Sequence, residues 1–376
     1  MRNDGLSVYV HIPFCVRKCL YCDFLSVAFD GRKEEAYLEA LLREISDAAG
    51  SYRGKRVKTV YFGGGTPSLI PATHIKRILD RLREVFIFEK DCEISLEINP
   101  KTADETGIKT LIGSGVNRFS LGMQSASDAE LKALGRVHLN KDLLEAFHLL
   151  RRLGAKNINL DIMTGIPFQN MDSLKNTLDQ AISLKPEHIS AYALIIEPGT
   201  PFFEMGREKL DLCDEDMEME MYEYTADFLE KNGYQRYEIS NFSLAGRKCL
   251  HNLSYWNCDD YLGFGCSAAS RIGNARFTNI KDIDEYIKSP VKNRSEELVL
   301  DEEELMSEFF FMGMRKTEGI GENTFRDRFG RGIYDVYGDR LDKHIRHGLI
   351  IRDGDRLRFS RRGMDVSNIV LSDFVS

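Results

Sequence analysis

The first half of the chain alternates between two hydrophobic patterns. Short runs rich in Val, Ile, Phe and Tyr are typical of buried strands, and the longer segments between them carry apolar residues at helical spacing. The runs predict strands over 7–12, 57–62, 92–98, 116–121, 156–162 and 187–194, and the segments predict helices over 33–49, 71–85, 104–113, 140–153 and 172–184. Because helical crossovers join parallel strands, we expect an α/β fold with a parallel sheet. Its functional residues should follow the carboxyl ends of the strands.

The alternation stops after residue 194. An acidic amphipathic helix is predicted over 207–232, residues 233–285 are richer in Gly, Asn, Tyr and Cys, and the charged stretch 293–297 is typical of a linker. Beyond it, three helices are predicted over 301–316, 322–329 and 334–347, followed by a hairpin over 349–359 that turns at Asp353-Gly354. Helices followed by a hairpin resemble a winged helix. We therefore expect a barrel-type domain over 1–240, a connecting region over 241–295 and a small α+β domain over 296–376.

Composition and charge narrow the class of protein. The 376 residues are 43% hydrophobic and 29% charged, and the formal net charge is −8. Nucleic-acid binding requires a surplus of Lys and Arg, whereas residues 301–376 carry 13 Lys and Arg against 15 Asp and Glu. We expect no nucleic-acid partner, and we interpret the winged-helix-like domain as a lid or docking domain.

Cysteine usage points to the cytoplasm. We identify no signal peptide, and no stretch reaches the roughly 18 apolar residues of a membrane span. Three of the eight cysteines stand in one short loop, which favours metal binding in a reducing compartment over a disulfide framework. Cys249, Cys258 and Cys266, at wide spacing, are more typical of buried structural cysteines.

Cys15, Cys19 and Cys22 form a C-x3-C-x2-C loop directly after the first predicted strand. Thiolates are the usual ligands of iron–sulfur clusters, and three of them would hold three irons of a cubane cluster and leave the fourth iron open to a small molecule. Structural zinc needs a fourth ligand, commonly in a second C-x2-C or H-x3-H half, and none follows closely. The spacing favours a cluster, while a zinc site and chance clustering stay open at this point.

Other candidate residues stand at the ends of later strands. Gly63-Gly64-Gly65-Thr66 follows the second strand, and three glycines would let the backbone approach a ligand closely. No Gly-Lys-Ser/Thr follows, so this is not a phosphate loop. Glu97, Gln124 and Asp161 would suit the ammonium and ribose hydroxyls of one polar ligand. Each alone is more typical of a helix cap or a satisfied strand end.

Together these motifs resemble those of the radical S-adenosylmethionine (radical SAM) superfamily, whose hallmark is C-x3-C-x2-C on a partial (β/α)6 barrel. The resemblance implies that Cys15, Cys19 and Cys22 hold a [4Fe-4S] cluster whose open iron chelates S-adenosylmethionine through its amino and carboxylate groups. In that superfamily, one-electron reduction cleaves the sulfonium to a 5′-deoxyadenosyl radical, chemistry that belongs to the cofactor.

Longer segments that begin at Tyr9, Gly63, Glu97 and Asp161 are similar to the oxygen-independent coproporphyrinogen III oxidase family and its relatives. The resemblance implies S-adenosylmethionine contacts by Tyr9, Tyr21, Gly64, Gly65, Thr66, Glu97, Gln124, Arg136 and Asp161. From its local sequence, Arg136 is as typical of a solvated charge at a helix end.

Two features depart from the oxidase. Phe24 stands where the oxidase has a fourth cysteine, in C-x3-C-x2-C-x-C. The oxidase also has a long N-terminal segment that covers its active site, whereas 14 residues precede Cys15 here. Both differences count against porphyrinogen decarboxylation, and whether the chain is an enzyme stays open.

The segment His251-Asn252-Leu253-Ser254-Tyr255-Trp256 matches the H-N-x-x-Y-W signature of a haem-chaperone family paralogous to the oxidase. Imidazole is a common axial haem ligand and phenolate a rarer one. The resemblance implies haem binding by His251, Asn252, Tyr255 and Trp256. From the residues alone there is an alternative, in which His251 and Asn252 cap or cross-link a loop while Tyr255 and Trp256 fill the domain junction.

We therefore expect a cytoplasmic haem chaperone with a [4Fe-4S] cluster and S-adenosylmethionine, which delivers haem to an apo-haemoprotein. A respiratory acceptor, a transient membrane-associated partner and a homodimer are further candidates. The rival is an oxygen-independent coproporphyrinogen III oxidase. A DNA-binding iron–sulfur regulator is disfavoured by the acidity of the chain.

Overall fold

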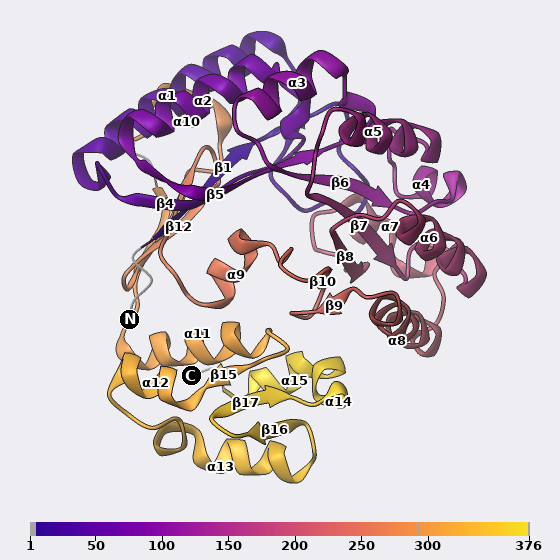
Figure 1. Cartoon of the computed structure of the whole chain (residues 1–376), viewed down its shortest axis with the longest axis vertical. Coiled ribbons are helices and arrows are strands. Elements are labelled where there is room, and N and C mark those ends of the chain that lie inside the picture. Colours follow the sequence, from indigo (N-terminus) through magenta and orange to yellow (C-terminus); the bar gives the residue numbers. More distant parts are fainter. Residues whose placement is uncertain (1–4, 292–293, 375–376) are drawn as a thin grey trace.

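A computed structural model describes residues 5–291 and 294–374. Six strands form its centre and pair in parallel in chain order: β1 (Leu6–Ile12), β4 (Arg56–Gly64), β5 (Ile87–Ile98), β6 (Arg118–Gln124), β7 (Ile158–Thr164) and β8 (His188–Ala193). Between them come α1 (Gly31–Tyr52), α2 (Ala72–Val85), α3 (Glu105–Gly113), α5 (Asn140–Arg152) and α6 (Met171–Ser183), which cover the outer face of the sheet (Figure 1). The predicted alternation of strands and helices is confirmed.

Periodicity explains these helices. In α2 the buried residues are Ile75, Ile78, Leu79, Leu82 and Val85, which lie three or four residues apart and so face the sheet together. The strands are buried along most of their length, as expected for a parallel sheet that is covered on its outer face and packed on its inner one.

The sheet extends further than predicted, to twelve strands in the order β14-β13-β12-β11-β1-β4-β5-β6-β7-β8-β10-β9. The added strands are β9 (Gln235–Arg236), β10 (Asn241–Ser243), β11 (Tyr261–Phe264), β12 (Ala269–Ile272), β13 (Ala275–Asn279) and β14 (Arg294–Val299). Since β14 and β9 stand at opposite edges, the described strands form an open, curved sheet, which is a partial barrel (Figure 1).

Two sequence predictions need correction. Residues 294–297, predicted as part of a linker, lie in β14 and pair with β13, and Asn293 lies outside the described residues. Charged side chains suit β14 because it is an exposed edge strand. The acidic helix α8 (Glu215–Lys231) begins later than residue 207, because the Asp214 side chain caps it by accepting from the Met217 amide at 2.9 Å.

The C-terminal residues form a separate small domain with its own aromatic core around Phe310, Phe325 and Phe374. It contains α11 (Glu302–Met314), β15 (Ile320–Gly321), α12 (Glu322–Phe329), α13 (Ile333–Arg346), β16 (Ile350–Asp353), β17 (Arg356–Phe359), α14 (Arg361–Asp365) and α15 (Ser367–Ser372). The hairpin β16–β17 turns at Gly354, where φ is 60°. This confirms the helix-and-hairpin prediction for a winged-helix-like domain.

One short helix, α9 (Leu250–Trp256), carries the His251–Trp256 segment. It lies on the concave side of the sheet, between the sheet and the C-terminal domain (Figure 1). No helix in the described part of the chain is long and apolar enough to cross a membrane.

Candidate functional site

The three-cysteine loop lies at the carboxyl end of β1. Cys15 ends β2 (Phe14–Cys15), which pairs with β3 (Val27–Ala28), and the Leu20 amide donates to the carbonyl of Leu134 at 3.1 Å. The loop is thereby fixed at both ends and in its middle. Cys15, Cys19 and Cys22 are half-buried and line one cavity of about 170 Å³.

Close approach of the backbone, rather than a ligand alone, explains two of the glycines at the end of β4, Gly64 and Gly65. A Cβ at Gly65 would stand 2.8 Å from the carbonyl oxygen of Phe14. A Cβ at Gly64, where φ is 112°, would stand 2.5 Å from the His11 ring. The glycines therefore let the end of β4 pack directly against His11 on β1 and against Phe14, which precedes the cysteine loop. This packing is a second reason for glycine at these positions.

The polar residues predicted at the strand ends are brought together. Glu97, Gln124 and Asp161 line the cavity with the cysteines. Burial, together with the charge of Asp161, raises the pKa of Glu97 to about 7, although the Tyr61 hydroxyl donates to Glu97 Oε1 at 2.9 Å. Gln124 turns into the cavity because a register shift interrupts β6 there and its φ is 64°.

Arg136 is half-buried in this cavity and is not a solvated helix-end charge. Its Nη2 donates to the carbonyl of Gly122 at 3.0 Å, and its Nη1 lies 3.7 Å from Cys19 Sγ. A guanidinium beside a thiol stabilises the thiolate form that a metal requires.

Of the nine residues predicted to contact S-adenosylmethionine, eight line the cavity: Tyr21, Gly64, Gly65, Thr66, Glu97, Gln124, Arg136 and Asp161. Tyr9 lies deeper, where its hydroxyl is hydrogen-bonded to His11 Nδ1 at 3.0 Å. Ser120 and Tyr192, which were not among the predicted residues, also line the cavity. Ser120 could have been found from the two-residue period of β6, which places it on the same side as Gly122, another lining residue.

The donor set suits an iron–sulfur cluster that has three protein ligands. Burial raises the pKa of Cys22 to about 11 and also raises that of Cys15, so a cationic centre is needed to keep these thiols ionised. Among the described residues that line the cavity there are three cysteines, and Phe24, at the position of the oxidase's fourth cysteine, lines it too. A cluster bound here would therefore have one iron without a cysteine.

The His251–Trp256 segment is engaged with the barrel interior. His251 is 1% exposed, its Nδ1 is hydrogen-bonded to Thr59 Oγ1 at 2.8 Å, and its Nε2 to the Tyr255 hydroxyl at 2.8 Å. Burial lowers the pKa of His251 to about 3. The ring of Trp256 is covered by the Arg315 guanidinium, 4.4 Å from the ring centroid. These contacts are those of the cross-linking alternative, and Asn252, half-buried on the same helix, lies beside them.

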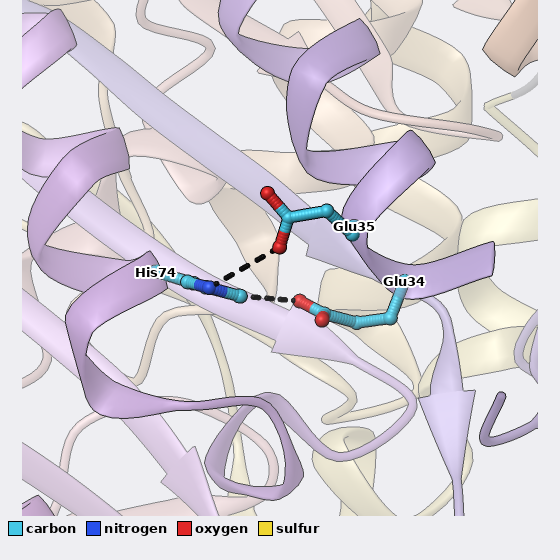
Figure 2. Close-up of side chains that lie close together, drawn as sticks. All are labelled: Glu34, Glu35 and His74. Carbon is cyan, nitrogen blue, oxygen red and sulfur yellow. Dashed lines mark hydrogen bonds and ion pairs between the residues drawn. The ribbon is translucent and has the colours of Figure 1, made fainter. Parts of the chain in front are cut away.

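A second group of candidate metal ligands lies on the outer face of the sheet, away from this cavity. His74 on α2 contacts Glu34 at 2.8 Å and Glu35 at 3.4 Å, both on α1 (Figure 2). These contacts tie the two helices together, and we assign the group to helix packing.

Two family models match the chain, the radical SAM superfamily over residues 9–181 and the HemN C-terminal domain over residues 300–366. Among solved structures, the coproporphyrinogen III oxidase HemN of Escherichia coli, described as a radical SAM enzyme, has a TM-score of 0.87 and 23% identity, covering 99% of this chain and 90% of its own. That likeness shows the fold. The radical SAM family model, together with the cysteine loop and its cavity, defines a protein of the radical SAM class.

Relatives across the whole chain are more specific. The heme chaperone HemW of Lactococcus lactis subsp. lactis is 35% identical over 98% of this chain and 97% of its own. The heme chaperone HemW of Bacillus subtilis is 35% identical over 98% and 99%, respectively. The chain belongs to the HemW heme chaperone family.

Proposed function

We propose that this chain binds haem and delivers it to an apo-haemoprotein, and that it holds a [4Fe-4S] cluster and S-adenosylmethionine at the carboxyl ends of its strands. The observation that carries the proposal is the full-length relationship to proteins named heme chaperone, in a chain that keeps the His251–Trp256 segment and has Phe24 in place of a fourth cysteine.

Cys15, Cys19 and Cys22 are the proposed cluster ligands. The shared cavity and the nearby guanidinium of Arg136 support this assignment. A bound cluster would supply three thiolate-held irons and one iron that is open to a small ligand.

The proposed S-adenosylmethionine residues surround the open side of the same cavity. Glu97 and Asp161 offer carboxylates for an ammonium group and for hydroxyls, and Gln124 offers an amide. Gly64, Gly65 and Thr66 line the cavity, as do Tyr21, which lies within the cysteine loop, and Arg136, which lies beside Cys19. We propose that Tyr9 supports the site indirectly through His11, because its hydroxyl is hydrogen-bonded to His11 and Tyr9 does not line the cavity.

For haem, we propose that His251, Asn252, Tyr255 and Trp256 act by fixing α9 and the loop that follows it. Both ring nitrogens of His251 have partners within the chain, so a role as iron ligand would require those hydrogen bonds to break. The proposal includes a haem acceptor, for which a respiratory protein and a transient membrane-associated partner are candidates. It also includes a homodimer and a cytoplasmic location.

An anaerobic haem titration of cluster-reconstituted protein, followed by Soret absorbance, tests the function. We expect saturable, stoichiometric binding, and transfer of the haem to a separable apo-haemoprotein. Tyr255→Phe, which removes the hydroxyl bonded to His251, should weaken haem binding if the segment acts through the placement of α9. It should leave binding unchanged if His251 is itself the iron ligand, since Nε2 would then be free.

The rival function, oxidative decarboxylation of coproporphyrinogen III, is tested in the same preparation. With a reductant and S-adenosylmethionine, we expect no protoporphyrinogen IX. Product formation together with an absence of saturable haem binding would replace the chaperone by the oxidase.

A further inference from the structure

Helix α9 packs inside the barrel against β1, β4 and β5. The hydroxyl of Ser7 on β1 donates to Ser254 at 2.7 Å, and Glu93 on β5 accepts from the backbone amide of His251 at 3.1 Å. With Thr59 on β4, bonded to the His251 ring, these residues are all buried. Three consecutive strands of the sheet, β1, β4 and β5, thus hold α9 inside the barrel. A planar tetrapyrrole near α9 must therefore lie outside the lumen, on the side of the C-terminal domain.

A large cavity lies on that side. It has a volume of about 1060 Å³, at the upper end of the roughly 300–1,000 Å³ of known ligand pockets. Its lining includes Asn257 and Cys258, the two residues that directly follow the His251–Trp256 segment. The start of β4 forms one side, and the C-terminal domain forms the other through α11, β15 and α12.

The cavity combines apolar surface with available cations. Tyr52 and Ile272, both half-buried, line it from the barrel. Lys55 and Arg56 stand exposed at the start of β4, and no residue within 5–291 or 294–374 makes a hydrogen bond or ion pair with either side chain. Arg356 lines the cavity from the C-terminal domain, where it lies 3.6 Å from Glu318. Guanidinium and ammonium groups at the rim of a cavity that has both polar and apolar walls suit the carboxylates of an amphipathic ligand.

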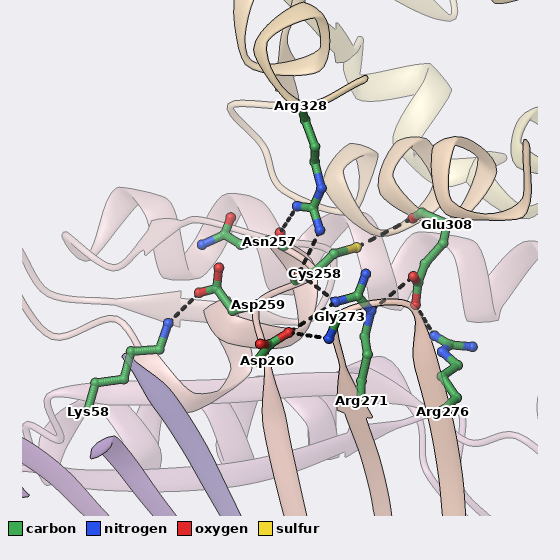
Figure 3. A network of polar contacts seen from close by, with 10 residues as sticks. All are labelled: Lys58, Asn257, Cys258, Asp259, Asp260, Arg271, Gly273, Arg276, Glu308 and Arg328. Carbon is green, nitrogen blue, oxygen red and sulfur yellow. Dashed lines mark hydrogen bonds and ion pairs between the residues drawn. The ribbon is translucent and has the colours of Figure 1, made fainter. Parts of the chain in front are cut away.

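The acidic residues of the lining are mostly neutralised within the chain. Asp259 is paired with Lys58, Asp260 accepts from the Gly273 amide at 2.9 Å, and Glu318 lies 3.6 Å from Arg356 (Figure 3 shows the first two). Asp327 is the remaining acidic group of the lining. The unpaired cations of the barrel rim therefore outnumber the unpaired anions.

We propose that this cavity between the barrel and the C-terminal domain is the haem site, with the propionates bound by Lys55 and Arg56 at its rim. The proposal rests on the haem-binding function proposed above and names its location. It places haem at the amino-terminal ends of the strands. Arg56 and Gly64 are separated by eight residues of extended strand, or roughly 26 Å, and Gly64 lies beside the cysteine loop. In this proposal haem is cargo that is held apart from the cluster.

The test is an anaerobic haem titration of the full-length, cluster-reconstituted chain. The double variant Lys55→Glu/Arg56→Glu should bind haem at least tenfold more weakly, because two exposed attractive charges become repulsive. Thr324→Trp, an exposed lining position on α12, should weaken binding by filling the cavity without a change in charge. The matched control is Lys132→Glu/Lys141→Glu, two exposed lysines on the outer face of the barrel.

Haem dimethyl ester, which keeps the iron and the macrocycle but lacks the carboxylates, is the second probe. Wild type should bind it weakly, and the Lys55/Arg56 variant should bind it no worse than wild type does. Iron content and S-adenosylmethionine binding should be unchanged in every variant, which shows that the barrel is folded.

The outcomes separate the two proposals. Tight haem binding by wild type that neither Lys55→Glu/Arg56→Glu nor Thr324→Trp weakens would overturn the location and leave the chaperone function standing. Weakening by Thr324→Trp alone would refute recognition of the propionates by Lys55 and Arg56. Failure of wild type to bind haem would overturn the chaperone function, and the haem site with it.

Discussion

Replacing Glu308 by Gln should loosen the C-terminal domain from the barrel. The Glu308 side chain on α11 is 8% exposed, and its two oxygens accept from Arg271 Nε at 3.0 Å and from Arg276 Nη2 (Figure 3). These arginines lie on β12 and β13, so a single carboxylate joins the two domains. An amide keeps one acceptor but directs a donor at the other guanidinium.

The cost follows from the burial of the partners. Removing one partner of a buried ion pair destabilises a protein by about 3–5 kcal/mol. Arg271, 3% exposed, would keep its bond to the Cys258 carbonyl at 2.9 Å and a weaker contact with Asp260 at 3.8 Å. Arg276 is 36% exposed, so solvent screens its share. We expect the low end of the range, about 3 kcal/mol, for the free energy of docking.

Hydrogen exchange is the appropriate measurement, because global unfolding of a two-domain chain is not a two-state process. A loss of about 3 kcal/mol corresponds to a fall of roughly 100-fold in the protection of amides that exchange through opening of the domain interface. The control is Glu303→Gln, an exposed glutamate on the same helix, which should change stability by no more than about 0.5 kcal/mol. Equal protection of α11 in the two variants would refute the assignment of Glu308 as an energetically important link between the domains.

Two further predictions concern the cysteine loop and its cavity. Gly65→Ala should lower the iron content of the reconstituted protein severalfold, because its Cβ would stand 2.8 Å from the Phe14 carbonyl oxygen, whereas Gly50→Ala, with open space around it, should load normally. The raised pKa of Glu97, about 7, means that its carboxylate is increasingly protonated below pH 7, so S-adenosylmethionine affinity measured by calorimetry should fall about tenfold from pH 8 to pH 6. Glu97→Gln should abolish this pH dependence. Tyr61→Phe, which removes a hydrogen bond that lowers the Glu97 pKa, should move the midpoint of the pH dependence to higher pH. A midpoint that neither variant moves would show that another group titrates.

The parts of the fold that follow from local pattern were predictable. The six central strands are rich in buried hydrophobic residues, the helices between them have a clear 3.6-residue period, and Asp353-Gly354 marks the hairpin. The strands at the edges of the sheet were not predictable, because β9 and β10 are only two and three residues long and β14 is exposed along its whole length. Their pairing depends on neighbours that are distant in the chain, which local composition does not encode.

The candidate site divides in the same way. The cysteine spacing and the strand-end polar residues led to one cavity, since parallel strands bring their carboxyl ends together. The environment of His251 could not be predicted, because its partner Thr59 stands 192 residues earlier in the chain. That contact makes the His251 ring part of the barrel interior, which the residues of the segment alone do not encode.

The proposed cofactor and haem sites stand at opposite ends of the strands, so any influence of one on the other has to pass through the barrel. The structure offers a short route. Glu97, in the cavity of the cysteines, accepts from the Tyr61 hydroxyl at 2.9 Å, and the Tyr61 ring stacks on His251 with 5.1 Å between ring centroids. His251 in turn fixes α9 through Thr59, and α9 leads directly into the Asn257–Cys258 wall of the large cavity. A change of charge or position at Glu97 is therefore two side chains away from the helix that shapes the proposed haem site. This route would carry a response from the proposed cofactor site to the proposed haem site while haem stays at the other end of the strands.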